Sequence, residues 1–363
     1  MKFIDLAKQQ SRIKSNIDKA IKKVLKHGKY IQGPEVFELE EKLAEYTGSK
    51  HCISVANGTD ALQIAQMALG IKQGDEVITT AFSFVSVAET ISLLGAKPVF
   101  VDINPETFNL DPDFLESAIT PRTKAIIPVS LFGQCADFDE INSIAIKHKI
   151  PVIEDGAQSF GALYKNKKSC NLSDIACTSF FPSKPLGCYG DGGAIFTNNS
   201  NLAESIRQIA THGQHERYHY VRFGINSRLD TLQAAILIEK LAVLDDEIET
   251  RNKIAETYSN QLSGISAIKT PVVKQFNKSV FAQYTIKLSN RDDVKERLAK
   301  KDIPSAVHYP VPICNQPAYK SSSHVLEYSN EAANTVLSIP MHPYLSDQNI
   351  SKIINELSEA VKS

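Results

Sequence analysis

Short apolar runs alternate with helix-like stretches through the first half of the chain, and this alternation constrains the fold more than any other feature. The helix-like stretches 58–69, 87–94 and 138–148 lie between such runs and carry apolar residues at helical spacing. Strands that alternate with helices predict an α/β fold with a mostly parallel sheet covered on both faces. The predicted strands are 51–55, 76–80, 98–103, 125–131, 151–155, 175–180 and 194–197.

The pattern changes at about Asp230. The stretch 232–262 predicts one or two long helices with repeated charges on an outer face. The charges expected to face outward are Asp245, Glu247, Glu249, Arg251 and Lys253.

The remaining C-terminal sequence predicts a smaller α/β unit. Strand-like segments occur at 282–288 and 305–309, and a terminal helix is predicted from Asp347. We therefore expect two domains: a large domain over 1–240, which includes the N-terminal segment, and a small domain over 241–363.

The composition excludes several classes of protein. Of the 363 residues, 42% are hydrophobic and 22% charged, and a formal net charge of −1 gives no field to attract nucleic acid or an anionic membrane. There is no signal-peptide core and no apolar run near the roughly 20 residues of a membrane helix, so we expect a cytoplasmic protein. The six cysteines form no C-x-x-C pair, which favours reduced thiols over a metal site or disulfides.

The segment 179–187, Ser-Phe-Phe-Pro-Ser-Lys-Pro-Leu-Gly, places Lys184 between aromatic residues and a glycine-rich turn. Desolvation there would favour the neutral, nucleophilic amine, which can form a Schiff base with an aldehyde cofactor. Taken alone, a lysine in a loop is more often an ordinary surface residue. The following glycines lead into the strand 194–197 rather than a helix, and they do not match G-x-G-x-x-G, which disfavours a nicotinamide site.

Asp155 ends the buried run 151–155, at the edge where α/β sheets bind ligands. A carboxylate there can keep the ring nitrogen of pyridoxal phosphate (PLP) protonated, so that the ring accepts the electrons of a carbanion. The lysine and the acid together therefore predict PLP as the cofactor. The alternative for Asp155 is a helix N-cap, since Gly156 and Ala157 could open a helix. Gln158 could hydrogen-bond the ring oxygen of the cofactor or face solvent.

A phosphate site is predicted where Asn-Gly-Thr-Asp, residues 57–60, begins the helix 58–69. Free backbone N–H groups and the helix dipole favour a phosphate there, and the hydroxyls of Thr59 and Ser179 could add hydrogen bonds. An ordinary helix cap explains the stretch equally well when it is taken alone. Phe84 follows a predicted strand and could stack on the cofactor ring, although core packing is the commoner fate of a phenylalanine.

These stretches, in this order, resemble the PLP-dependent nucleotide-sugar aminotransferases of the DegT type, within the aspartate aminotransferase superfamily. The resemblance implies fold type I of the PLP enzymes, in which a mostly parallel seven-stranded sheet of the large domain lies between helices. It runs nearly the whole chain, with shared motifs at 3–6, 33–36, 57–59, 154–161, 179–184, 190–193 and 224–228.

The family implies roles around the cofactor ring. Lys184 would be the Schiff-base lysine and proton shuttle, and Asp155 would hold the pyridine nitrogen. Gln158 would lie beside the ring oxygen, where some members have histidine. Phe84 would stack on the ring.

The family also implies how the phosphate is held. Gly58, Thr59, Asp60 (through its backbone) and Ser179 would surround it within one chain. Asn226 would reach it from the neighbouring subunit, so the resemblance implies an obligate homodimer with shared active sites.

A closer resemblance is to the branch that acts on UDP-2-acetamido-2-deoxy-3-oxo-glucuronate in bacterial surface-polysaccharide (O-antigen) pathways, with similar stretches at 53–63, 128–139 and 307–310. It implies a UDP-linked keto-sugar as substrate and L-glutamate as amino donor. The carboxylate of a hexuronate needs a cation or several hydrogen-bond donors. The candidates for that contact, each of which could instead be structural, are Arg228, His308 and Tyr309.

We predict a transamination in two halves. Glutamate first donates its amine to the cofactor and leaves as 2-oxoglutarate, and the keto-sugar then takes the amine at C3. Other possibilities stay open: a dTDP-linked 3-keto or UDP-linked 4-keto hexose as substrate, or a non-catalytic sensor that keeps the fold. A sugar dehydratase of the same fold is disfavoured, because histidine replaces the lysine in that branch and this chain has Lys184.

Overall fold

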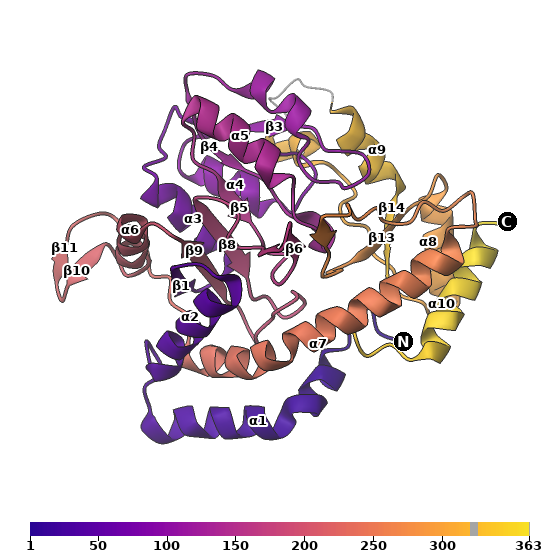
Figure 1. Ribbon diagram of the computed structural model, residues 1–363, viewed down its shortest axis with the longest axis horizontal. Helices are drawn as coiled ribbons and strands as arrows, with labels where there is room; N and C mark the ends of the chain where they lie inside the picture. Colours follow the sequence, from indigo (N-terminus) through magenta and orange to yellow (C-terminus); the bar gives the residue numbers. More distant parts are fainter. Residues whose placement is uncertain (320–325, 363) are drawn as a thin grey trace.

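Seven strands form one layer in the computed structural model, which describes residues 1–319 and 326–362 (Figure 1). Two hydrogen-bonded groups, in the orders β3-β2-β4 and β5-β8-β9-β1, are joined by the parallel bridges Ile126–Val152 and Val129–Asp155. All but β9 run in one direction, since β9 is antiparallel to both neighbours. The mostly parallel sheet is confirmed; its strands are β1 (His51–Val55), β2 (Glu76–Thr80), β3 (Lys97–Val101), β4 (Thr123–Ile127), β5 (Ile153–Asp155), β8 (Ile175–Ser179) and β9 (Gly193–Thr197).

Both faces of this sheet are buried, as its continuous apolar runs predict. Along β4, Ala125 and Ile127 pack into one hydrophobic cluster, whereas Ile126 between them packs into another. Cys52 and Ile53 of β1 divide between the two clusters in the same way. Because successive side chains of a strand point to opposite faces, each cluster is the core on one side of the sheet.

Helices pack on these two faces. The helix α3 (Gly58–Ala68) follows β1 directly and contacts β8 and β9. Its N-terminus therefore lies beside the ends of strands that come more than a hundred residues later. The other helices that pack against the sheet are α2 (Pro34–Thr47), α4 (Ser86–Leu93), α5 (Phe138–His148) and α6 (Ser200–Ala210).

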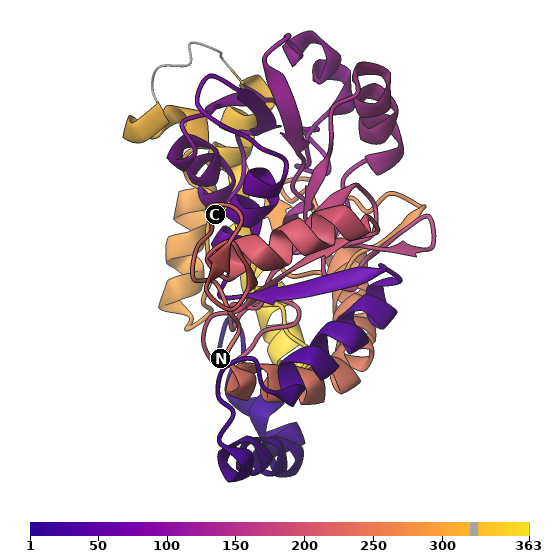
Figure 2. The same cartoon turned by 90° about the vertical axis from the view of Figure 1, so that its left-hand side faces the viewer.

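One long helix, α7 (Thr231–Leu262), crosses the molecule, and α1 (Leu6–His27) packs along its outer side (Figures 1 and 2). The prediction of an outward charged face was wrong for Glu247 and Arg251, which are buried. Glu247 accepts hydrogen bonds from a glutamine of α1 and from the hydroxyl of Tyr344. The first helix and the C-terminal loop thus cover that face of α7.

A pair of antiparallel strands, β13 (Tyr284–Lys287) and β14 (Val336–Ile339), forms the C-terminal part. The predicted strand at 305–309 was wrong, because this segment makes one isolated bridge, between Ala306 and Ser338. The helices of this part are α8 (Arg291–Lys300), α9 (Glu327–Thr335) and α10 (Asp347–Ala360).

The packing partners change partway along α7. Ile248 packs with the core of the seven-stranded sheet, whereas Ile254 packs with the C-terminal strand pair and its helices. This change supports two units, and the division into domains 1–240 and 241–363 remains a prediction.

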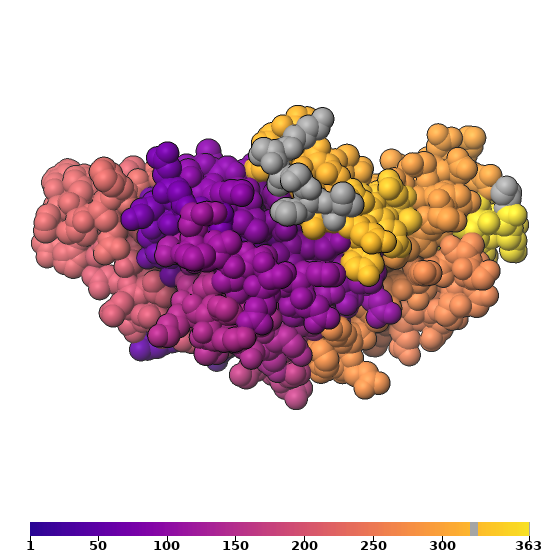
Figure 3. Space-filling model, turned by 90° about the horizontal axis from the view of Figure 1, so that it is seen from above, coloured from indigo at the N-terminus to yellow at the C-terminus, as the bar shows by residue number. Residues whose placement is uncertain are grey.

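Short strands complete the described chain. A hairpin of β10 (Gln214–Glu216) and β11 (His219–Tyr220) projects at one end of the molecule, opposite the C-terminal helices (Figures 1 and 3). The other short strands are β6 (Leu163–Tyr164), β7 (Lys167–Lys168) and β12 (Asn277–Lys278). No helix of the described residues combines the length and apolar character needed to cross a bilayer. All six cysteines are free and buried.

Candidate active site

A cavity of about 710 Å³ opens where β5 and β8 end, between the start of α3 and the segment that carries residues 308 and 309. This is the carboxyl edge of the parallel strands, where ligands of α/β proteins bind. The cavity brings together most of the predicted site residues, namely Gly58, Thr59, Asp60, Phe84, Asp155, Gln158, Ser179, Lys184, His308 and Tyr309.

Two predicted residues lie outside this cavity. Asn226 forms a bridge with Thr211 near the base of the projecting hairpin, and Arg228 lines a small pocket together with Arg207. Within one chain, neither Asn226 nor Arg228 lines the cavity that holds the other predicted site residues.

The first turn of α3 forms one wall of the cavity. The side chain of Asn57 caps the helix by accepting a hydrogen bond from the Asp60 N–H at 2.8 Å, so this N–H is already used within the chain. The N–H groups of Gly58 and Thr59 have no acceptor among the described residues. A Cβ at Gly58 would lie 2.6 Å from the Cβ of Ser179, so glycine is needed for this close approach. The turn is both a helix cap and a site with free donors for an anion.

Asp155 is buried at the end of β5. Its Oδ1 accepts a hydrogen bond from the Ala157 N–H at 3.0 Å, which closes a local turn. No helix begins at Gly156, so the helix-cap alternative was wrong. Burial raises the pKa of Asp155, and the positive charge of Lys184 opposes that rise. A buried carboxylate with so few donors favours a cation placed against it.

Lys184 lies in the loop between β8 and β9. Backbone hydrogen bonds hold this loop: the Lys184 N–H donates to the Phe181 oxygen at 2.9 Å, and the Cys188 N–H donates to the Phe180 oxygen at 2.7 Å. The amine of Lys184 makes no hydrogen bond or ion pair within the part of the chain that the structure describes. Burial lowers the pKa of Lys184, as predicted, while the charge of Asp155 opposes the change. The amine of Lys184 therefore loses its proton more readily than that of an exposed lysine.

Gln158, Tyr309 and His308 line the cavity with defined orientations. Gln158 Oε1 accepts a hydrogen bond from the Phe132 N–H at 2.9 Å, and its Nε2 donates to the Tyr309 hydroxyl at 3.2 Å. Gln158 is buried, so the alternative in which it faces solvent was wrong. Nδ1 of His308 lies 3.1 Å from Oγ of Ser338.

Phe84 stands at the rim. Its side chain is 54% exposed, so core packing does not account for it. A planar ring that borders the cavity and remains open on one side is free to pack against a bound aromatic ligand.

Several lining residues were not predicted from sequence. They are Ser83, Ser183, Asp191 and Gln283. Gln283 precedes β13, and its Oε1 is buried with no donor among the described residues. No local motif marks Gln283, because it reaches the cavity through the packing of the C-terminal part. In the structure, the unpaired acceptor marks it as a candidate for ligand contact.

Glu154, the neighbour of Asp155 on the other face of β5, gives a test of burial at this edge. It accepts hydrogen bonds from the Ser169 hydroxyl at 2.7 Å and the Cys170 N–H at 2.8 Å, and burial raises its pKa from 4.5 to about 7. The folded protein therefore keeps a proton that the unfolded chain releases between these values, so folding becomes less favourable as the pH rises through that range. From about pH 5 to about pH 8, the unfolding free energy of the wild type should fall by roughly 2 to 3 kcal/mol relative to Glu154→Gln. Urea titrations at both pH values measure this difference, and parallel pH profiles would contradict the raised pKa.

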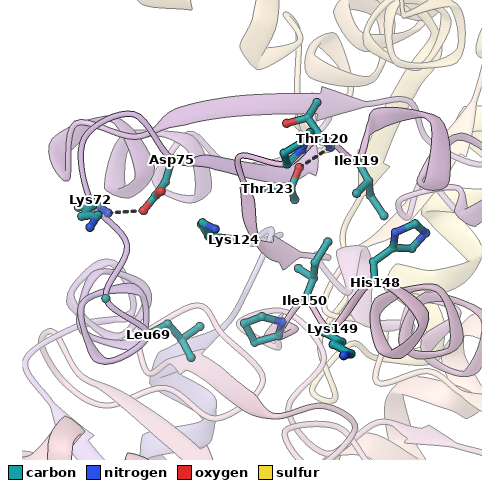
Figure 4. Close-up of a pocket in the computed structure, with 13 residues that line it drawn as sticks. Leu69, Lys72, Asp75, Ile119, Thr120, Thr123, Lys124, His148, Lys149 and Ile150 are labelled. Carbon is teal, nitrogen blue, oxygen red and sulfur yellow. Dashed lines mark hydrogen bonds between the residues drawn. The ribbon is translucent and has the colours of Figure 1, made fainter.

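A second cavity, of about 720 Å³, lies at the opposite edge of the sheet, where β2 and β4 begin (Figure 4). Lys72, Lys124 and Lys149 surround it with exposed side chains, and Asp75 accepts a hydrogen bond from the Lys72 N–H at 3.0 Å. This cavity has no buried acid and amine in contact with each other's charge. We therefore take the first cavity as the candidate active site, although the two cavities are similar in volume.

The seven-stranded sheet and the lysine–aspartate pair at its carboxyl edge define a fold-type I enzyme. The sequence description of the DegT/DnrJ/EryC1/StrS aminotransferase family matches residues 11–358. The chain therefore belongs to this family of aminotransferases.

Similar proteins span the whole chain. The UDP-2-acetamido-2-deoxy-3-oxo-D-glucuronate aminotransferase of Pseudomonas aeruginosa is 61% identical over 358 residues, which are 99% of each protein. A pleiotropic regulatory protein of Geobacillus stearothermophilus is 43% identical over 98% of this chain and 97% of its own length. Among solved structures, an aminotransferase of the same family from Brucella abortus has a TM-score of 0.97 and 45% identity over the full length of both chains. NtdA from Bacillus subtilis, with bound cofactor PMP, has a TM-score of 0.92 and 31% identity over all of this chain and 85% of its own.

Proposed function

We propose that this chain transfers an amino group from L-glutamate to C3 of a UDP-linked 3-keto sugar, with pyridoxal phosphate as cofactor. The observation that carries the proposal is the partly buried amine of Lys184 and the buried carboxyl of Asp155, in one cavity with the free N–H groups that begin α3. An amine, an acid and an anion site are the three contacts that this cofactor needs.

The lining residues fit pyridoxal phosphate. Gly58, Thr59 and Ser179 offer N–H and hydroxyl donors to the phosphate, and the unpaired amine and the carboxylate suit the aldehyde carbon and the ring nitrogen. Phe84 would pack on the ring, and Gln158 would lie beside its oxygen. When bound, the cofactor supplies an electron sink for a carbanion at the α carbon of the amino acid. The NtdA structure with bound cofactor PMP supports this choice.

In this proposal, Lys184 moves the proton. As a neutral amine it would accept the proton from the α carbon of glutamate, and as an ammonium group it would give a proton to the carbon that was the aldehyde carbon of the cofactor. The lowered pKa of Lys184 makes the neutral, basic form of its amine more available than that of an exposed lysine. The carboxylate of Asp155 would stay ionised beside the positive ring nitrogen of the cofactor, and so keep the proton on that nitrogen in place.

The keto-sugar that we propose is UDP-2-acetamido-2-deoxy-3-oxo-D-glucuronate, the substrate named for the Pseudomonas aeruginosa relative at 61% identity. His308 and Tyr309 line the cavity and offer N–H and O–H groups to the hexuronate, and Arg228 would add a cation. The pathway would be the biosynthesis of bacterial surface polysaccharide, including the O-antigen of lipopolysaccharide, and the compartment the cytoplasm.

We further propose a homodimer with shared sites. The loop around the projecting hairpin exposes large side chains, with Phe223 96% exposed and Tyr218 73% exposed. Aromatic groups this exposed indicate a contact surface. Asn226 and Arg228 follow the hairpin and lie outside the cavity of their own chain, so a second chain is where they could complete a site.

Two defective variants should therefore complement each other when they are co-expressed. Lys184→Ala removes the amine, and Asn226→Ala removes the contribution of one chain to the site of the other. In a mixed dimer, one of the two sites combines an intact Lys184 with an intact Asn226. Because random pairing makes half of the dimers mixed, about a quarter of wild-type activity should return. The matched control pairs Lys184→Ala with Asp155→Ala, which lie in the same cavity and should not complement. Mixed dimers without recovered activity would contradict shared sites.

One observation favours a second candidate function. The relative from Geobacillus stearothermophilus is named a pleiotropic regulatory protein, which fits a non-catalytic regulator with this fold. Such a protein has no need of an unpaired, partly buried lysine in one cavity with a buried acid, so the site favours the enzyme. The alternative substrates remain a dTDP-linked 3-keto hexose and a UDP-linked 4-keto hexose.

The deciding experiment follows the visible absorbance of the cofactor-loaded protein. Glutamate should convert the absorbance to that of the amine form, and addition of UDP-2-acetamido-2-deoxy-3-oxo-D-glucuronate should restore it with formation of a 3-amino sugar nucleotide. Conversion without restoration would reject this sugar and direct the test to the dTDP-linked and 4-keto alternatives. No response to any amino donor would reject the aminotransferase and favour the regulator.

A further inference from the structure

A chain of buried hydroxyl groups leads from the C-terminal strand pair to the cavity. Thr285 of β13 and Ser338 of β14 face each other in register, with their Oγ atoms 2.9 Å apart. Oγ of Ser338 also lies 3.1 Å from Nδ1 of His308. Thr285 is 2% exposed and Ser338 0% exposed, so neither hydroxyl is open to bulk solvent.

The backbone fixes this arrangement. Ala306 and Ser338 exchange two hydrogen bonds, of 3.0 and 2.8 Å, which hold the segment before His308 against β14. The ring of Phe3, from the N-terminal segment, lies 6.2 Å from the ring of His308 between centroids. The imidazole is therefore held by the strand pair on one side and by the start of the chain on another.

The direction of the hydrogen bonds follows from the number of hydrogens. Ser338 has one hydroxyl hydrogen and two polar neighbours, so it donates to one and accepts from the other. If Nδ1 of His308 donated to Ser338, Ser338 would donate to Thr285, and the Thr285 hydrogen would have no acceptor within the described residues. In the reverse direction Thr285 donates to Ser338, Ser338 donates to Nδ1, and every group is paired. Because an unpaired buried donor is unfavourable, the second direction is preferred.

The other nitrogen of the ring then carries the hydrogen. Burial lowers the pKa of His308, and the charge of Lys184 lowers it further, so both favour the neutral ring, which has one N–H group. His308 lines the cavity, and Nδ1 is taken by Ser338. Nε2 is the nitrogen left for a ligand.

We propose that Thr285 and Ser338 are positioning residues that fix His308 as an Nε2–H donor for an oxygen atom of the bound sugar. The position of the hydrogen on the His308 ring depends on the protein alone. The proposal that a sugar oxygen accepts this hydrogen bond rests on the proposed function. A carboxylate or carbonyl oxygen is the chemical group that such a donor selects.

Nitrogen NMR of the full-length protein with its cofactor bound tests the tautomer. The protein is labelled with ¹⁵N-histidine, and His308→Gln identifies the signals of this ring in a long-range ¹H–¹⁵N spectrum. The wild type should show a protonated Nε2 and an unprotonated Nδ1. A hydrogen on Nδ1, or on both nitrogens near neutral pH, would overturn the proposal.

Three variants test the two hydroxyls. Ser338→Ala and Thr285→Val should each replace the single tautomer by a mixture, and Thr285→Ser, which keeps the hydroxyl, should preserve it. Ser338→Ala and Thr285→Val should also raise KM for the keto-sugar about three- to tenfold while leaving the half-reaction with glutamate unchanged. An unchanged tautomer in both, or an unchanged KM despite a mixed tautomer, would overturn the proposal. Failure of the proposed function would look different, since the wild type would then not aminate the sugar whatever its tautomer.

Discussion

Replacement of Lys184 by alanine is expected to abolish amino transfer. The variant loses the one amine that the structure places, without a partner, in the cavity among the described residues. Positioned acid–base groups alone contribute about a hundred- to ten-thousandfold, and Lys184 would also bind the cofactor, so we expect a loss of at least about a thousandfold. The measurement is the absorbance change in a single turnover with glutamate, after circular dichroism has shown that the variant is folded.

A matched control for this change exists in the second cavity. Lys124 is an exposed lysine with no partner among the described residues, and it lies at the opposite edge of the sheet (Figure 4). Lys124→Ala should keep wild-type turnover. If Lys184→Ala retained more than about a tenth of the activity, the amine would not be the proton carrier that we propose.

Exchange of Asp155 for asparagine should slow both half-reactions about a hundred- to a thousandfold while leaving the fold intact. Asparagine keeps the oxygen that accepts the Ala157 N–H, so the local turn can persist. It lacks the charge that would hold a protonated ring nitrogen, and it also removes the charge that opposes the lowering of the Lys184 pKa. The pKa of Lys184 should therefore fall further, and in the apoprotein the loss of its charge should begin at lower pH than in the wild type.

The test compares kcat for the glutamate half-reaction across Asp155→Asn and Asp155→Glu. The glutamate variant keeps the charge on a longer side chain, so it should retain more activity than the asparagine variant. Equal loss in both would mean that the shape of the residue, rather than its charge, is what the reaction requires.

The strands and their helices were predictable because each depends on local sequence. The bounds of β1, β2 and α5 agree with the apolar runs that predict them, since burial on both faces leaves a continuous pattern. The places of Asp155 and Lys184 were predictable for the same reason, because Asp155 ends β5 and Lys184 lies in the loop after β8.

What could not be predicted depends on distant partners. Glu247 and Arg251 have the spacing of solvent-facing charges, yet both are buried, and Glu247 accepts hydrogen bonds from α1 and from the C-terminal loop. Gln283 reaches the cavity through the packing of the C-terminal part, and Asn226 lies outside the cavity of its own chain. In each case the surroundings of the side chain depend on segments that lie outside its local sequence.

The antiparallel strand β9 also dictates when this protein can mature during synthesis. Within the described part of the chain, β1 pairs with β9 alone, so it has no strand partner until residues 193–197 have left the ribosome. At about 5–20 residues per second, β1 waits roughly ten to thirty seconds with an open edge that chaperones could protect. The turn that begins α3 follows β1 and packs against Ser179 at the end of β8, and β9 lies between these two strands, so the proposed phosphate site also waits for β9. Cofactor loading would therefore wait until residues 193–197, just past the middle of the 363-residue chain, have been made, and a chain truncated before β9 should be unable to take it up.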